Sequence, residues 1–264
     1  MLLHSLPSTE VSGGEGAAHI APYLEKTYGH DGFALILDEG GGYQSLYGTT
    51  VAALGVGEKG YNDIRVSVKT LGGHSSVPPE HTSIGYLSLV VAHLEAYPHK
   101  PHLTRENPFY STLVCAATHG DVGPKLDGLI KGSIKCDKKL HKLEAELSET
   151  RAYKALIGTT QAVDLISGGV KVNVRAGSAE ALSRPTLLNT LPDLHRQALP
   201  ELASAVVNHR INVASSAAEL QERIIKVVSV KAKELNLTLS AFGEDIIKGP
   251  GDGQIVLEEA FGHR

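Results

Sequence analysis

The residues from Asp63 to Lys69 alternate strictly between apolar and polar side chains, and this run limits the fold more than any other feature of the sequence. Ile64, Val66 and Val68 supply the apolar members. A period of two is that of a β-strand with one buried face and one face toward water. The sequence therefore predicts a sheet that packs against something on one side.

The neighbouring patterns predict what packs there. Thr82 to Tyr97 has apolar residues at helical spacing, with Thr82 or Ser83 as the N-terminal cap, and a second amphipathic helix opens at Ser215. Further strands are predicted at 161–173, 205–213 and 237–240. The order is strand, helix, two strands, helix, strand, with extra residues after the first helix. We expect an α/β protein with the split βαβ arrangement of a ferredoxin-like layer.

Composition excludes two classes of partner. The net charge is −4, aromatic residues make up 5% and there is no tryptophan, so the sequence predicts neither a phosphate-binding face nor a base-stacking surface. Nucleic acid is not an expected partner. No apolar run reaches the length of a membrane span. Cys115 and Cys136 show no metal or redox spacing, and we expect free thiols rather than a disulfide.

An apolar run at Phe33–Leu37, preceded by a helical pattern that ends at Tyr28, stops at the acidic, glycine-rich turn Asp38-Glu39-Gly40-Gly41-Gly42. Carboxylates just past a central strand lie where α/β enzymes usually place their sites. Two acidic residues alone also suit a solvated turn.

A lone histidine, His74, stands between a glycine pair and a proline pair in Gly72-Gly73-His74-Ser75-Ser76-Val77-Pro78-Pro79. The glycines permit a tight exit from the strand, and the prolines stiffen the following loop. From chemistry alone His74 could simply pack or cap the next helix.

Six short motifs in this order resemble the zinc-dependent family of carboxypeptidase S, glutamate carboxypeptidase and aminoacylase. They are Glu10-Val11-Ser12-Gly13, Ile36-Leu37-Asp38-Glu39-Gly40, Gly60-Tyr61, Gly72-Gly73-His74-Ser75-Ser76 with Pro78, Lys171-Val172-Asn173, and Asn208-His209-Arg210-Ile211. The carboxypeptidase S branch is the most similar. The resemblance implies a two-zinc catalytic domain followed by a ferredoxin-like lid domain through which two subunits pair.

The resemblance gives Glu10 and Asp38 as one ligand for each zinc ion. In the family a general base stands immediately before the first of these, but here that residue is Thr9, which has no group titrating near neutral pH. The family's other ligands would lie before this chain and beyond its lid. We therefore expect that the chain alone does not retain zinc and is inactive.

The same resemblance assigns three further roles. His74 would donate a hydrogen bond to the oxyanion, often in the active site of the partner subunit. Asn173 and Arg210 would hold the free carboxylate of the substrate, which suits the fork of a guanidinium group. The alternatives are a turn-forming asparagine and an edge arginine that reaches for solvent.

The predicted domains are a partial catalytic domain at 1–62, a lid and dimerisation domain at 63–245, and the start of a return to the catalytic domain at 246–264. The lid would carry a helical insertion at about 98–158. A stretch at 174–197 interrupts the family pattern, and a retained intron is one origin for it. Loops of that length are usually functional or disordered.

Three functions remain open. They are a zinc carboxypeptidase acting on small peptides, an N-acyl amino acid amidohydrolase, and a catalytically inactive lid that only dimerises. The resemblance favours a homodimer through the lid and a vacuolar or secretory location.

Overall fold

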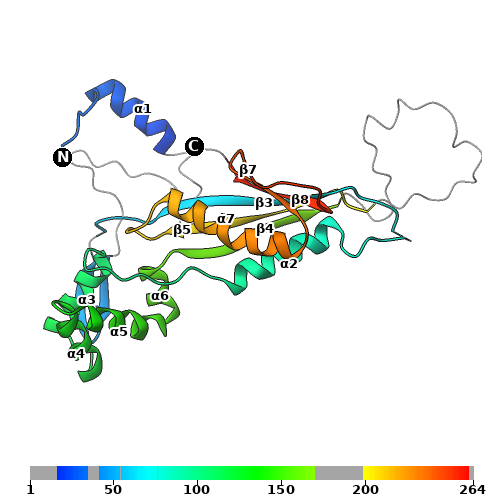
Figure 1. Cartoon of the computed structure of the whole chain (residues 1–264). Coiled ribbons are helices and arrows are strands. Elements are labelled where there is room, and N and C mark those ends of the chain that lie inside the picture. Colours follow the sequence, from blue (N-terminus) through cyan, green and yellow to red (C-terminus); the bar gives the residue numbers. More distant parts are fainter. Residues whose placement is uncertain (1–16, 35–41, 54, 76, 170–198, 262–264) are drawn as a thin grey trace, which may run out of the picture. The chain divides into compact units, whose positions relative to one another are not determined.

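The computed structural model describes residues 17–34, 42–53, 55–75, 77–169 and 199–261 (Figure 1). They belong to two compact units, one of residues 1–44 and 52–55 and one of residues 45–51 and 56–264. The first unit contains helix α1 (Ala17–Tyr28), as the pattern ending at Tyr28 predicts. A two-stranded hairpin follows, formed by β1 (Gly42–Leu46) and β2 (Thr49–Ala53).

A six-stranded mixed sheet dominates the second unit, with the strand order β4-β5-β3-β8-β6-β7. Its strands are β3 (Gly60–Thr70), β4 (Thr160–Gly168), β5 (Leu202–Ile211), β6 (Thr238–Ala241), β7 (Glu244–Ile247) and β8 (Gly253–Glu259). The predicted α/β class is confirmed. The predicted succession of strand, helix, two strands, helix and strand is present in β3 to β6.

Helices α2 (Ser83–Ala96) and α7 (Ala217–Glu234) pack against one face of this sheet (Figure 1). Thr82 is the N-cap of α2, since its Oγ1 accepts a hydrogen bond from the N–H of Gly85 at 3.2 Å. The apolar side of β3 is fully buried beneath the helices, as the alternation predicts, through Ile64, Val66 and Val68.

Strand β8 occupies a place that the sequence did not predict. A simple ferredoxin-like layer would set β6 beside β3, whereas here β8 lies between them, antiparallel to β3 and parallel to β6. The positive φ angles of Phe242 and Gly243 turn the chain from β6 into β7. The sheet thus continues past residue 245, into the segment for which we predicted a return to the catalytic domain.

The residues between α2 and β4 form a helical insertion with its own apolar core. Its helices are α3 (Pro108–His119), α4 (Pro124–Ser133), α5 (Asp137–Ser148) and α6 (Arg151–Ile157). Leu113, Ile130 and Leu143 are fully buried among them. Cys115 and Cys136 are both exposed and free.

Two polar side chains, the buried Asn212 and the partly buried Lys59, join the insertion to the sheet. Asn212, directly after β5, donates hydrogen bonds from Nδ2 to the carbonyls of His102 and Ile157 at 3.1 and 2.8 Å. Lys59, directly before β3, donates to the carbonyls of Ala155 and Gly158. Both ends of the insertion are therefore held at the same end of the β3–β5 pair. Within the described ranges, no helix has the length and apolar character needed to cross a membrane.

Candidate functional site

Three of the five predicted site residues, Glu10, Asp38 and Asn173, lie outside the described residues, and their roles stay predictions. The parts of the chain that the structure describes contain no cluster of three or more His, Cys, Asp or Glu side chains able to hold a metal ion. These parts do not themselves fit a zinc centre, and we derive no zinc chemistry from them.

Arg210 is placed by the pairing of β5 with β3. The two strands run antiparallel in a continuous register that sets Arg210 opposite Tyr61. Alternation along β5 turns the neighbouring His209 toward the helices and Arg210 toward the opposite face, where its side chain is exposed. The guanidinium carbon lies 5.6 Å from the centroid of the Tyr61 ring, a cation–π distance. No carboxylate among the described residues pairs with Arg210.

His74 follows the other end of β3. Gly72 has φ +66°, and a Cβ added there would come within 2.8 Å of Glu201 Cγ, so this exit from the strand requires glycine. The carbonyl of Gly73 then accepts a hydrogen bond from the N–H of Leu199 at 2.8 Å. His74 itself is partly buried.

The two predicted residues therefore stand far apart in one chain. Arg210 pairs with Tyr61 near the start of β3, whereas His74 comes after Thr70 at its end. At about 3.3 Å per residue the intervening strand is roughly 30 Å long. A small substrate cannot reach both side chains of the same copy.

His209, a buried histidine beside Arg210, is not among the site residues that the sequence predicts. Its side chain has 0% exposure. The ring lies edge-on to that of His99, with 5.5 Å between the centroids. Neither nitrogen of His209 makes a hydrogen bond of normal geometry within the described parts of the chain. The signal that could have found it is the alternation Val207, His209, Ile211, which puts the histidine in line with buried residues.

Burial sets the protonation of both rings. Loss of water lowers the pKa of His209 to about 4, although the nearby backbone of Asn62 and Val207 raises it, and the charge of Arg223 lowers it further. Burial lowers the pKa of His99 to about 3, with Arg223 and His209 acting in the same direction. Both rings are thus neutral in the folded protein at neutral pH.

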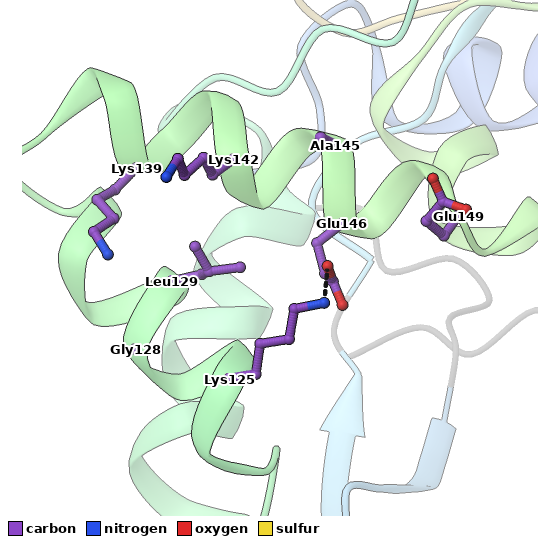
Figure 2. Close-up of a pocket in the computed structure, with 8 residues that line it drawn as sticks. All are labelled: Lys125, Gly128, Leu129, Lys139, Lys142, Ala145, Glu146 and Glu149. Carbon is purple, nitrogen blue, oxygen red and sulfur yellow. Dashed lines mark ion pairs between the residues drawn. The ribbon is translucent and has the colours of Figure 1, made fainter.

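A surface groove of about 540 Å³ lies elsewhere, between α4 and α5 of the insertion (Figure 2). Leu129, Ala145 and Gly128 contribute its less polar lining, and Lys125 crosses it to pair with Glu146 at 2.6 Å. None of the predicted site residues lines this groove. Its chemistry is that of a solvated charged surface between two helices.

Comparison with known proteins identifies relatives over most of the chain. It is 38% identical to carboxypeptidase S of Saccharomyces cerevisiae over 240 residues, which cover 90% of this chain and 38% of the yeast protein. An uncharacterized carboxypeptidase of Schizosaccharomyces pombe is 36% identical, with 96% of this chain and 37% of that protein covered. The mouse N-fatty-acyl-amino acid synthase/hydrolase PM20D1 is 28% identical, with 93% and 43% covered.

The chain thus spans about two fifths of the length of the curated relatives it matches. No protein-family model matches it. Human carnosine dipeptidase 1 is a solved structure with 10% identity and a TM-score of 0.38 over 76% of this chain and 36% of that one. This likeness is too weak to bear on function.

Acidification should destabilise the protein through His209. Its pKa is about 4 in the folded chain and about 6.5 in the unfolded one, so the unfolded chain binds more protons between these values and stability falls as the pH falls. From pH 7 to pH 4.5 we expect a loss of roughly 2 kcal/mol from this residue, measured by urea unfolding.

His209→Leu should remove that share of the pH dependence, since leucine binds no proton. His141→Gln, which replaces an exposed histidine of α5, is the control and should leave the slope as it is. An unchanged slope in His209→Leu would contradict the assignment.

Proposed function

Because this chain belongs to the carboxypeptidase S-like family of metallopeptidases, we propose that it supplies the substrate-holding lid of a zinc metallocarboxypeptidase. The substrates are small peptides, cleaved at the C-terminal peptide bond. In this lineage zinc supplies the activated water. The described residues of this chain bind and orient the substrate.

The placement of Arg210 carries this proposal. A peptide cut at its last residue presents a free carboxylate next to the scissile amide, and a guanidinium group can donate two parallel hydrogen bonds to it. Arg210 is exposed, stacks near Tyr61 and has no acidic partner in the described part of the chain. An arginine that merely stabilised the sheet would be expected to pair as Arg65 does with Glu258.

An N-acyl amino acid is the second candidate substrate. It offers the same carboxylate beside an amide, and one group of relatives is named for N-fatty-acyl-amino acids. The higher identity to proteins named carboxypeptidase, at 38% and 36%, favours the peptide. Arg210 can bind the carboxylate of either substrate. The two substrates differ only in the group on the acyl side of the amide, so that group distinguishes them.

The separation of His74 from Arg210 supports a site shared between two copies. We propose that His74 of one subunit donates to the oxyanion of a substrate held by Arg210 of the other. Strand β4 is an edge of the described sheet, and Leu165 and Ile166 on it are 57% and 65% exposed. An apolar edge strand is a surface on which a second copy can pair, so we place the homodimer there.

We further propose that these 264 residues alone do not hydrolyse substrate. Thr9 occupies the position of the family's general base, and a hydroxyl group cannot accept a proton as a carboxylate does near neutral pH. By itself this chain would then bind the substrate carboxylate without hydrolysing the substrate. We place it in a vacuolar or secretory compartment, as the resemblance implies.

Carboxylate binding is the direct test of Arg210. N-acetyl-leucine, titrated into the labelled chain and followed by NMR, should shift the amides of Tyr61 and Arg210, whereas N-acetyl-leucinamide should not. Arg210→Gln should weaken binding at least tenfold, the loss of a charge-assisted pair. The control Arg65→Gln removes an arginine of the neighbouring strand β3 from the same face of the sheet and should bind normally. Equal binding of acid and amide would overturn the role.

Hydrolysis is tested with zinc added in excess, on two substrates. One is a dipeptide blocked at its N-terminus with a free C-terminal carboxylate, and the other is an N-dodecanoyl amino acid. We expect no hydrolysis of either by this chain, with a zinc carboxypeptidase as positive control. Hydrolysis that disappears with a chelator would refute the inactive-lid proposal, and the substrate consumed would then identify the class.

Sedimentation equilibrium tests the shared site. The chain should have twice its monomer mass at micromolar concentration, and Ile166→Lys should give the monomer because a charge on the paired edge opposes association. Val230→Lys, at an exposed apolar position of α7, should remain dimeric. A monomeric parent chain would exclude the shared site.

A further inference from the structure

A polar layer crosses three neighbouring strands on the face of the sheet whose core is otherwise apolar. The register sets Asn62 of β3, His209 of β5 and Gln161 of β4 side by side, on the face that α2 and α7 cover. Asn62 Oδ1, Gln161 Oε1 and both nitrogens of His209 are buried and make no hydrogen bond of normal geometry in the described ranges, although the backbone of Asn62 and Val207 lies near the His209 ring. Polar atoms in such places are almost always satisfied, by protein, water or an ion.

Two further groups close over this layer from outside the sheet. His99, in the segment after α2, places its ring against that of His209, and its Nε2 is buried without a partner among the described residues. Arg223 of α7 donates from Nη2 to the carbonyls of Tyr97 and Pro98 at 2.5 and 2.8 Å. Its Nη1 is buried, and no described residue accepts from it.

The charge of Arg223 decides which ligand suits the cluster. A guanidinium group stays charged, and although Arg223 is only partly buried, its Nη1 is shielded from water and has no acceptor among the described residues. No described carboxylate forms an ion pair with Arg223. A metal cation is excluded by its positive charge, although two imidazoles face each other here. A small anion would supply an acceptor for Nη1 and a charge opposite to that of the guanidinium group.

We infer that His99, His209 and Arg223 form an internal binding site for one monovalent anion of halide size. Arg223 Nη1 and one N–H of each imidazole ring donate to the anion. The oxygens of Asn62 and Gln161, which cannot contact an anion favourably, accept hydrogen bonds from water bound beside it.

Anion binding is coupled to proton uptake. The charged and titratable groups around the rings are Arg223 on α7 and Asp63 on β3, whose carboxylate faces away and accepts a hydrogen bond from Asn208 at 2.6 Å. Each proton gained by an imidazole adds one positive charge and one donor to the site. The affinity for the anion therefore increases as the pH falls, and the bound anion offsets part of the loss of stability caused by acid.

The test compares thermal unfolding of the intact chain in sodium bromide and in sodium gluconate at equal ionic strength, at pH 5.0 and pH 7.5. Bromide should raise Tm saturably, with a half-saturating concentration at least tenfold lower at pH 5.0, whereas gluconate is too large to enter. Arg223→Gln should lose the bromide effect. The exposed-site control Arg151→Gln should keep it. If Arg223→Gln does not fold, His99→Gln should raise the half-saturating concentration at least fivefold.

Two results would overturn the inference. One is a thermal result, which can take two forms. An equal Tm in both salts at both pH values would mean that bromide does not bind, and a bromide effect that survives in the variants would mean a general salt effect. The other is a crystal structure from bromide in which the anomalous signal is absent from the cluster and water alone bridges its atoms. An anomalous peak within hydrogen-bond distance of Arg223 Nη1 would establish the site. Neither outcome depends on hydrolysis or on Arg210.

Discussion

The antiparallel pairing of β3 with β5 is the constraint on which the rest of the second unit depends. It runs without a break from Gly60 opposite Ile211 to Lys69 opposite Leu202. Because side chains alternate along a strand, a slip of one residue would exchange every inward and outward position. It would bury the charge of Arg210 in the core and expose His209. That slip is costly because it would expose Ile64, Val66 and Val68, which are fully buried. Burial of each such side chain contributes about 1.5 to 3 kcal/mol to the stability of the fold.

The same pairing places the two predicted site residues, Arg210 and His74, at opposite ends of strand β3. Near Arg210 the sheet meets both stems of the helical insertion, which Lys59 and Asn212 hold in place by hydrogen bonds to backbone carbonyls. Past the other end of the sheet the chain leaves through Gly72 toward His74. A rigid strand between them cannot bend to bring these ends together. Any site that uses both residues therefore has to be completed by another molecule.

Local patterns predicted much of this architecture because they depend on short-range physics. The alternation from Asp63 to Lys69 and the cap at Thr82 need only side-chain direction and one hydrogen bond, and both are present. The position of β8 could not be predicted in this way, because seven residues after a glycine-rich turn carry no information about which strand they will join. That choice depends on the tertiary fit of Ile255 and Leu257 beneath the helices.

In the candidate site, too, local patterns predict the direction of side chains but not the contacts between residues remote in sequence. Alternation along β5 predicts that Arg210 and His209 point to opposite faces of the sheet, but it gives no function to His209. Its ring contact and its pKa depend on residues remote in sequence, His99 and Arg223, which meet it only in the folded chain. The metal-ligand roles of Glu10 and Asp38 and the carboxylate role of Asn173 come from family resemblance and stay predictions.

The junction between sheet and insertion differs in kind from the two cores that it connects. The sheet core and the insertion core are apolar, whereas the junction is made by Asn212, Lys59, Arg223 and the facing histidines. An apolar contact loses stability only when area is exposed to water, but a buried polar group costs about 1 to 3 kcal/mol whenever its partner is missing. Water or ions that enter the junction restore those partners, whereas they gain nothing in the cores. Entry of water therefore costs less at the junction than in either core, and an opening confined to the junction leaves both cores and the position of Arg210 on β5 intact.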